Sequence, residues 1–570
     1  MKTATRTLGP LLVLVLIIVP LWIFPYVPMT DAPNHLLAAF IAVHYQDPRF
    51  SFPRYFTVDL TPRSNVLGHY LMIALLKVGF SPEDTLRLFA TLIVLLSVGS
   101  LYLLLRVARG QEHARTWFWL GIPLAYTWYF HQGFLNFTLS VPLALLTLAW
   151  GIRYGLWGHT LVKGSQRDWA RGVLGGTILA YLTYLAHSLG LALVLTAAAA
   201  LVLGDVGVHL RERRARALVS DLIWVAVPFV LLATIVVLTG RLSPNVSGEA
   251  SAFLSPPFIV WAPLSKKVAE LRYGLFSFSP RREQWILTPA AGVILLSWIF
   301  SWRKVTRWHG PYLLSLVFYF LLPMGFWVPF IIYERFWLFT LLLLPLALPT
   351  FRSRSLRLAV QGLLALTALL FLINVTNDYR IANRNLRAYD AVLDQLPEQV
   401  WAFPFTYHHQ GRISPARHFW AYAMMRKDVF IPMVFAETYH PVQYRPEVRR
   451  PYPLAYENGF FAEHAHNRAT LWVRASDPLM QKVTLPKLAD YGYVRVGQVG
   501  PYWIFRLATW PPPVPDYARP HITPEVANAY SILLVYGYPP TYLIREVEEW
   551  YDLQTEIGLS RMYRRTERAD

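Results

Sequence analysis

The chain has 570 residues, of which 55% are hydrophobic and only 15% are charged, and its mean hydropathy is +0.34. Soluble globular proteins carry roughly 25% charged residues, so this composition excludes an ordinary soluble domain and predicts a protein with many membrane spans. The net charge of +19 comes from short basic clusters between apolar runs. That pattern is typical of membrane topology and of contact with membrane lipids, and it excludes nucleic acid as a partner. Because there is no cysteine, disulfides and thiolate catalysis are also excluded.

The first apolar run, Leu8–Phe24, follows Lys2 and Arg6. No small-residue cleavage site comes after it, so it predicts an uncleaved first span rather than a removed signal peptide. The next stretch, Met29–Tyr45, reads MTDAPNHLLAAFIAVHY. Thr30 and Asp31 are residues that can cap a helix, and a proline follows in the first turn, where its missing N–H is harmless.

Ten further apolar runs bring the expected number of spans to about eleven. They are Thr85–Leu105, Trp117–Phe130, Phe137–Trp150, Gly172–Ala186, Leu189–Leu203, Leu222–Thr239, Trp285–Phe300, Leu313–Ile332, Phe336–Pro349 and Leu358–Ile373. The run Asn65–Phe80 is ambiguous, because it is short and contains His69 and Lys77. If this run does not cross, every dense basic cluster falls on the cytoplasmic side, so we interpret it as a juxtamembrane helix.

This topology predicts a multi-pass protein of the inner cell membrane with a cytoplasmic N-terminus. We expect a transmembrane module over residues 1–375, with an outer first loop at 28–84 and a long outer loop at 241–284. An extracytoplasmic α/β domain is expected over residues 376–509. A Pro-rich linker, WPPPVPDYARP, then leads to a helical C-terminal extension over 510–570. The fold class is therefore mainly α: a polytopic helical bundle with a small C-terminal α/β domain on the periplasmic or extracellular side.

Short strands are predicted in the tail from β-branched and aromatic runs. They are Val400–Phe405, Val429–Phe435, Thr470–Val473, and the pair Tyr493–Val496 and Tyr502–Leu507, whose separation by GQVGP predicts a hairpin. Two segments of the tail, Pro524–Tyr536 and Tyr542–Thr555, are predicted to be helical.

Asp31 and His35 are the leading candidates for chemistry. Because they are four residues apart, they share one face of a helix that begins near Asp31. A carboxylate beside a membrane cavity can act as a general base, and an imidazole can orient it, share its proton or help to bind a divalent cation. The alternative is an ordinary helix cap and an interfacial histidine. A divalent metal is left open as a cofactor, with Asp31, His35 and Asp59 as its candidate ligands.

Other candidates lie at the outer ends of the expected spans. Arg335 can hold a lipid phosphate bidentately, and its neighbours Tyr333 and Glu334 lie in the same expected turn; a Glu–Arg pair at the interface is the alternative. The remaining candidate binding residues are Arg63, His69, His131, Asn136 and His187. A solvated loop is the alternative for the first two, and a satisfied interfacial residue is the alternative for the other three. The aromatic and basic tail segment that includes His408, His409, Arg412 and His418 suits either sugars or lipid headgroups.

The motif TDAPNHL, with an outer first loop, juxtamembrane helices and about eleven spans, resembles the GT-C class of membrane glycosyltransferases. The segments GFLNFTLSVPLALLTLAW, YERFWLFTLLLLPLAL and HHQGRISPARHFWAYAMM resemble uncharacterised bacterial membrane proteins often grouped with that class. The resemblance implies transfer of a sugar from a polyprenyl-phosphate-linked donor to a lipid, glycan or protein acceptor. It implies Asp31 as the base and Arg335 as a ligand of the donor phosphate. Here Asp31 is followed by Ala32, unlike the commoner acidic pair of the class.

Two other functions remain open from the sequence. One is a non-catalytic membrane scaffold, transport or assembly protein that uses its outer domain for binding. The other is a lipid-linked glycan polymerase or ligase of another fold. No Walker loop, GxGxxG, HExxH or GxSxG motif occurs in the chain, so nothing indicates a nucleotide or a zinc protease site.

Overall fold

The computed structural model describes most of the chain. The described residues are 4–156, 166–211, 230, 234, 258–302, 306–326, 332–406, 410–431, 433–436, 440–445, 448, 470–474, 493–499, 502–507, 532–536, 541–557 and 560–565. The expected span Leu222–Thr239 lies almost wholly outside them, as do His408 and His409 and the first part of the loop at 241–284.

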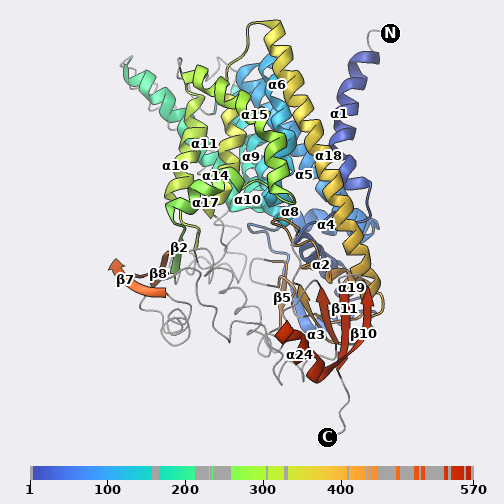
Figure 1. Cartoon of the computed structure of the whole chain (residues 1–570). Helices are drawn as coiled ribbons and strands as arrows, with labels where there is room; N and C mark the ends of the chain where they lie inside the picture. The colour runs from blue at the N-terminus through green and yellow to red at the C-terminus, as the bar shows by residue number, and fades with distance from the viewer. Residues whose placement is uncertain are drawn as a thin grey trace.

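A bundle of apolar helices forms one end of the molecule, and the tail packs at the other end, away from the N-terminus (Figure 1). The bundle helices are α1 (Ala4–Trp22), α5 (Pro82–Arg109), α9 (Leu135–Arg153), α10 (Gln166–Ala186), α11 (Ser188–Arg211), α15 (Pro280–Ser301), α16 (His309–Leu321), α17 (Ile332–Leu343) and α18 (Arg354–Leu393). Among the described residues, α5, α9, α15 and α18 are long and apolar enough to cross a membrane. The chain is therefore a membrane protein, and its fold class is confirmed as mainly α with a small α/β part.

The expected span Trp117–Phe130 is not one helix. It is divided into α6 (Gln111–Trp117), the 3-10 turn η1 (Phe118–Leu120), α7 (Gly121–Ala125) and α8 (Trp128–Gln132). Pro123 explains part of the break, because proline lacks the N–H that a continuous helix would use. The segment ends beside the first loop, where α8 leads through Gly133 into α9.

The spans expected at Leu313–Ile332 and Phe336–Pro349 have different limits in the structure. Helix α16 ends at Leu321, just before Pro323, and a short strand β3 (Gly325–Phe326) follows. Helix α17 begins at Ile332 and continues into the 3-10 turn η3 (Leu344–Leu346). Tyr333, Glu334 and Arg335 therefore lie in the first turn of α17, where the sequence analysis expected a loop.

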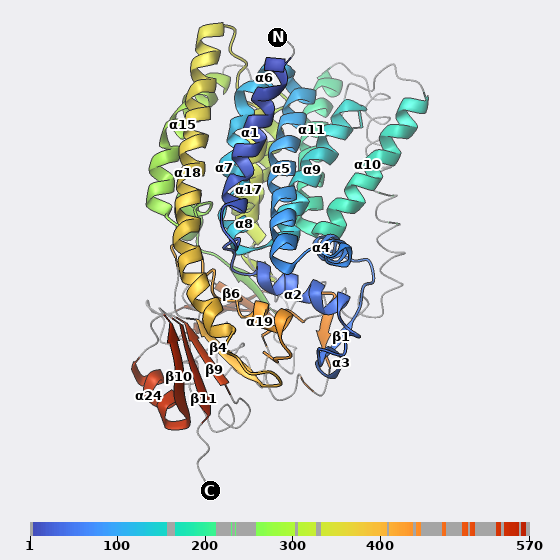
Figure 2. The ribbon, with the colours of Figure 1, turned by 90° about the vertical axis from the view of Figure 1, so that its right-hand side faces the viewer.

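The first loop forms a layer across the tail end of the bundle (Figure 2). It contains α2 (Ala32–Val43), α3 (Phe52–Tyr55), β1 (Phe56–Val58) and α4 (Leu67–Val78). The juxtamembrane helix expected at Asn65–Phe80 is α4, a 12-residue helix that is too short to cross a bilayer. It ends at Gly79, whose φ of 102° is a left-handed conformation that glycine adopts without a steric penalty.

Helix α18 is 40 residues long and runs through the boundary expected between residues 375 and 376. Its second half leaves the bundle and contacts the tail strands β10 (Tyr551–Ile557) and β11 (Ser560–Arg565). The module and the tail are thus joined by a continuous helix, and the tail begins after Leu393.

One tail sheet has the strand order β10-β11-β9-β4, in which β4 (Ala402–Thr406) pairs in parallel with β9 (Ile532–Tyr536). The helix expected at Pro524–Tyr536 is wrong for the described residues 532–536, which form β9. The helix expected at Tyr542–Thr555 is α24 (Thr541–Trp550), and it stops where β10 begins. The C-terminal residues are therefore part of a sheet with β4 rather than a separate helical extension.

A second sheet has the order β3-β2-β6-β8-β7. The predicted strand at Thr470–Val473 is β6 (Thr470–Arg474), and the predicted hairpin is β7 (Tyr493–Val499) with β8 (Tyr502–Leu507). Strand β2 (Phe258–Trp261) comes from the long loop at 241–284 and pairs with β6. A third pairing joins β1 of the first loop to β5 (Val442–Tyr444). Two loops of the bundle are therefore tied to the tail by backbone hydrogen bonds. The strand expected at Val429–Phe435 is reduced to an isolated bridge at Phe430.

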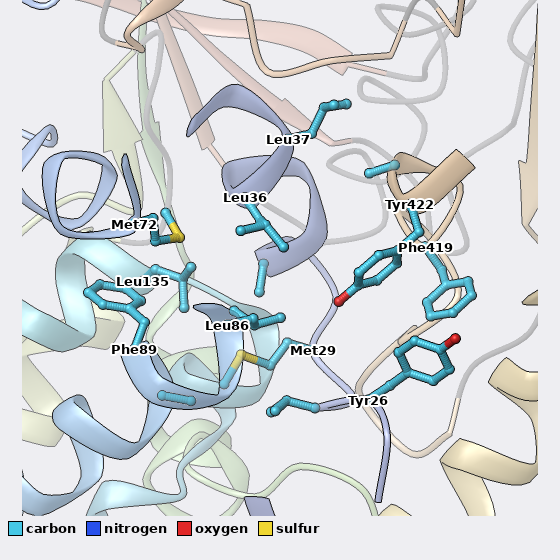
Figure 3. Close-up of a cluster of buried hydrophobic side chains, with 14 of the residues drawn as sticks. Tyr26, Met29, Leu36, Leu37, Met72, Leu86, Phe89, Leu135, Phe419 and Tyr422 are labelled. Carbon is cyan, nitrogen blue, oxygen red and sulfur yellow. The ribbon is translucent and has the colours of Figure 1, made fainter. Parts of the chain in front are cut away.

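A continuous apolar core joins the bundle, the first loop and the tail. Figure 3 shows Met29 and Leu36 near Leu86 of α5, with Tyr26 close to Phe419 of the tail. Leu36 and Leu37 of α2 are completely buried, as is Ala421 of α19 (Ala421–Arg426), which packs against α2. Burying a leucine side chain contributes about 1.5–3 kcal/mol. Because Leu36 and Leu37 lie in the first turns of α2, their burial fixes the place at which this helix begins.

Candidate active site

Asp31 is held at the start of α2 by the loop between α8 and α9. The backbone N–H of Thr30 donates to the carbonyl of His131 at 3.0 Å, and that of Asp31 donates to the carbonyl of Gln132 at 2.9 Å. Gly133 follows with a φ of +85°. A Cβ atom on Gly133 would lie 2.5 Å from the backbone nitrogen of Ala32, so only glycine permits this close approach. The backbone of Asp31 is thus placed by a second, unrelated segment.

The carboxylate of Asp31 is not used to cap the helix. The structure gives Asp31 the N-cap position of α2 without a side-chain cap hydrogen bond. Instead, Oδ1 lies 3.5 Å from Nε2 of His418, and Oδ2 accepts a hydrogen bond from Nε2 of Gln132 at 3.3 Å. The residue is 9% exposed. A buried carboxylate that is directed away from its own helix fits a chemical role better than a capping role.

The hydrogen bonds around Asn34 define the tautomer of His418. Asn34 Oδ1 accepts from the backbone N–H of Phe435 at 2.9 Å, and Nδ2 donates to the carbonyl of Met433 at 2.9 Å. These backbone groups fix which way the amide points, so its second N–H donates to Nδ1 of His418 at 3.2 Å. The His418 proton therefore sits on Nε2, facing the carboxylate of Asp31.

His418 is one of four buried histidines near the start of α2. Nδ1 of His35 lies 3.3 Å from Nε2 of His69, and the rings of both contact His440. Burial lowers the pKa of His35 to about 4. Burial, followed by neighbouring positive charge, also holds the pKa values of His69, His418 and His440 well below the usual value. All four rings are therefore neutral at pH 7, and Nε2 of the neutral His418 imidazole lies 3.5 Å from Oδ1 of Asp31.

Arg63 and Asp59 form a separate pair that fastens the first loop to the tail. Arg63 Nη1 lies 2.7 Å from Asp59 Oδ2, and Nη2 donates to the carbonyl of His440 at 2.6 Å. Asp59 also accepts from the side chain of Thr61. The arrangement joins Asp59 to Arg63 rather than to Asp31 and His35. In the described part of the chain, no group of three or more His, Asp or Glu side chains is placed to hold a metal ion.

The segment from His131 to Phe137 connects several of the predicted site residues. His131 is buried, with Nδ1 2.9 Å from Ser277 Oγ and Nε2 3.0 Å from the hydroxyl of Tyr379 on α18. Asn136 donates to the carbonyl of Asn65, and its Nδ2 lies 3.3 Å from Nδ1 of His69. This segment therefore carries groups that contact the first loop, α18 and α4.

Arg335 lies on α17 and is 5% exposed. Its Nη1 lies 2.9 Å from Nε2 of His187, and its guanidinium lies over the rings of Phe134 and Phe137, at 5.0 and 4.6 Å. Its Nε has no hydrogen-bond partner among the described residues. A buried guanidinium with an unused donor is costly unless an anion completes its contacts. The two rings beneath Arg335 thus come from the start of α9, which directly follows the loop that positions Asp31.

Tyr333 and Glu334 belong to a second polar cluster with α14 (Leu264–Tyr273). Lys266 Nζ lies 3.5 Å from Glu270 and 3.8 Å from Glu334, and the hydroxyl of Tyr333 donates to Glu270. Burial, and then the nearby charge of Glu334, raises the pKa of Glu270 to about 7. Lys267 donates to backbone carbonyls at the end of α16, including that of Leu322 at 2.7 Å. This cluster ties α14 to α16 and α17.

The sequence analysis did not connect Asp31 with its contacts. His418 was noted only as part of an aromatic and basic tail segment, and the segment that contains Gln132 was represented only by the candidates His131 and Asn136. Asn34 lies in the TDAPNHL motif, three residues after Asp31. This spacing was the sequence feature that could have indicated that Asn34 belongs to the same site. His440 was not singled out, and its neighbours in the sequence give no pattern that would have identified it.

The comparisons with known proteins concern the fold. No family model matches the chain, and no curated protein matches its sequence. Solved structures that are similar include ArnT from Cupriavidus metallidurans in the apo state, at 12% identity over 89% of this chain and 98% of that chain, with a TM-score of 0.47. The same protein bound to undecaprenyl phosphate covers 91% and 100% of the two chains at 11% identity and a TM-score of 0.45.

The apo oligosaccharyltransferase from Archaeoglobus fulgidus is also similar, at 14% identity over 96% of this chain and 81% of that chain, with a TM-score of 0.44. ArnT and this enzyme are GT-C glycosyltransferases, the class that the sequence resembles. Similarity at this level concerns the path of the backbone, and it assigns no role to any side chain of this chain.

Proposed function

We propose that the protein is a membrane glycosyltransferase that moves a sugar from a polyprenyl-phosphate donor to an acceptor hydroxyl. The acceptor is a lipid, a glycan or a protein on the periplasmic or extracellular face. The observation that carries this proposal is the carboxylate of Asp31, which is buried at the tail end of the bundle and directed toward His418 and Gln132. The donor class follows the resemblance of the TDAPNHL segment to GT-C enzymes.

Asp31 acts as the general base. The acceptor hydroxyl gives its proton to the carboxylate while its oxygen forms a bond to the anomeric carbon of the sugar. The bond from that carbon to the donor phosphate breaks, and its electron pair stays on the phosphate oxygen, which leaves as polyprenyl phosphate. His418 and Gln132 hold the carboxylate in one orientation, in which it receives the proton of the acceptor hydroxyl.

Arg335 binds the phosphate that leaves. Its guanidinium is already desolvated, stacked on Phe134 and Phe137, and has an unused Nε donor. A phosphate placed there would gain charge-assisted hydrogen bonds in a site of low dielectric constant, which stabilises the developing negative charge. His187, on the turn between α10 and α11, holds the guanidinium from the other side.

The test uses the purified full-length chain with a set of polyprenyl-phosphate-linked sugars. We expect release of polyprenyl phosphate when an acceptor extract is present, detected by mass spectrometry. Arg335→Gln should raise the donor KM and slow release, whereas Arg54→Gln, an exposed arginine of the first loop, should behave like the wild type. A scaffold protein would release no polyprenyl phosphate with any donor, would tolerate Asp31→Asn and would fail only when the tail is removed.

A further inference from the structure

An apolar groove lies between α1 and α18. It has a volume of about 430 Å³ and is lined by Leu16 and Val19 of α1, by Phe24 just after α1, and by Leu369, Leu372, Ile373, Thr376, Asn377 and Arg380 of α18. Both helices lie on the right-hand side of the bundle in Figure 1, which is the side that faces the viewer in Figure 2. The lining is apolar along most of its length and becomes polar only at the end nearest the tail.

The polar end of the groove carries positive charge. Arg380 lies at that end and donates to Asn377 Oδ1 at 3.0 Å. Arg384 and Arg387 follow at the spacing that places them on the same face of α18, and all three arginines are exposed. Within the part of the chain that the structure describes, none of the three forms an ion pair. The groove ends at Arg380, and Arg384 and Arg387 continue along the same face of α18. An apolar groove with this basic end is complementary to a molecule with an apolar chain and an anionic head.

The groove is separated from the candidate active site by α18 itself. Tyr379, next to Arg380, is completely buried and contacts His131 on the inner side, while Arg380 is exposed on the outer side. The side chain of Asn383 on α18 accepts a hydrogen bond from the N–H of Tyr26 and donates one to its carbonyl. These bonds join the segment after α1 to α18 beyond the groove. A head group bound at Arg380 would therefore lie outside the wall that surrounds Asp31, where it is not available for sugar transfer.

We infer that this groove binds an anionic phospholipid of the surrounding bilayer. One acyl chain fills the groove between α1 and α18, and the phosphate is held by Arg380 with Arg384 and Arg387 nearby. The groove wall on α1 includes Leu16, which is exposed, and the wall on α18 continues into exposed Leu369 and Ile373. The lipid would cover these side chains and join α1 to α18 at the edge of the bundle.

The experiment measures lipid binding to the delipidated full-length protein by native mass spectrometry. Phosphatidylglycerol, phosphatidylcholine and undecaprenyl phosphate are each added, alone and in competition. We expect phosphatidylglycerol to bind most tightly. Arg380→Gln should weaken that binding about tenfold, because a hydrogen bond to a charged group is lost. The control Arg54→Gln should leave it unchanged.

A second pair of variants tests the groove rather than the charge. Val19→Phe should fill the groove and reduce bound phosphatidylglycerol, whereas Leu366→Phe, on an exposed part of α18 outside the lining, should not. Equal binding of phosphatidylglycerol and phosphatidylcholine, an unchanged affinity in Arg380→Gln, or displacement of phosphatidylglycerol by undecaprenyl phosphate would each overturn the inference. These outcomes are independent of whether the protein transfers sugars.

Discussion

Nε2 of His418 lies 3.5 Å from Oδ1 of Asp31, although one residue begins the first helix of the outer loop and the other belongs to the tail. The Asn34 amide accepts from Phe435 N–H and donates to Met433 C=O and His418 Nδ1. The proton of His418 thus points at the carboxylate. A carboxylate that faces this imidazole on one side and Gln132 on the other gains a fixed orientation.

Removing His418 should slow transfer without removing the base. We expect His418→Ala to reduce kcat about 100-fold, because the carboxylate loses its orientation. His418→Gln, whose amide can donate to Asp31, should recover part of the rate. His113→Gln, a buried histidine on α6, is the control for loss of an imidazole. Equal rates in His418→Ala and the wild type would show that the contact is not used.

Asn34→Asp should reproduce the effect of losing His418. An aspartate cannot donate to Nδ1 of His418, so the ring would take the other tautomer and present a lone pair to Asp31. The lone pair of His418 and the carboxylate of Asp31 would then repel each other. The measurement is the transfer rate together with the ¹⁵N resonances of labelled histidine, which report which nitrogen carries the proton. An unchanged tautomer in the variant would contradict the assigned hydrogen-bond chain.

Gly133→Ala should displace Asp31. Its Cβ would lie 2.5 Å from the nitrogen of Ala32 and 2.8 Å from that of Asp31, in addition to the strain of a φ of +85°. Gly79→Ala is the matched control, because Gly79 has a φ of +102° but nothing within 4 Å of its Cβ position. We expect Gly79→Ala to cost about 1–2 kcal/mol of stability and to keep the transfer rate. Gly133→Ala should lose both stability and rate.

Stability should fall as the pH drops below about 6.5. The pKa of His35 is lowered to about 4 by burial, so the folded chain resists a proton that the unfolded chain binds near its usual pKa of about 6.5. Above about pH 6.5, His35 is neutral in both the folded and the unfolded chain, and its contribution to the stability of the fold is fully present. Between about pH 6.5 and pH 4 this stabilisation is lost progressively, and the loss is on the order of 3 kcal/mol for one such histidine.

Thermal unfolding between pH 4 and pH 7.5 measures this dependence. His35→Gln should flatten the change of melting temperature with pH, because one buried imidazole is removed. His44→Gln, at the partly exposed end of the same helix, is the control. A wild-type melting temperature that is independent of pH over this range would show that the four histidines do not stay neutral in the folded protein.

Local patterns predicted most of the bundle. The long apolar runs became α5, α9, α15 and α18, and the run interpreted as a juxtamembrane helix became the short helix α4. The errors lie where tertiary contacts override local preference. Residues 532–536 are β9 because β4 and β11 pair with them on either side, a context that their own sequence does not contain.

The sequence predicted only the part of the candidate site that lies at the start of α2. TDAPNHL identified Asp31 because its helix-start signals are local, and His35 because four-residue spacing defines a helix face. The contacts of Asp31 come from Gln132 and His418, which the fold brings from two other segments. The proposed role of Arg335 rests on its contacts with Phe134 and Phe137, which belong to the start of α9 and not to α17.

The measurement that tests the central claim most directly is the single-turnover rate of sugar transfer from a polyprenyl-phosphate donor by Asp31→Asn. The control is Asp47→Asn, which changes a carboxylate of the same loop that pairs with Arg49. We predict that Asp31→Asn lowers the rate about 10²–10⁴-fold with an unchanged melting temperature, while Asp47→Asn transfers like the wild type. A folded Asp31→Asn protein that transfers the sugar at the wild-type rate would contradict Asp31 as the base.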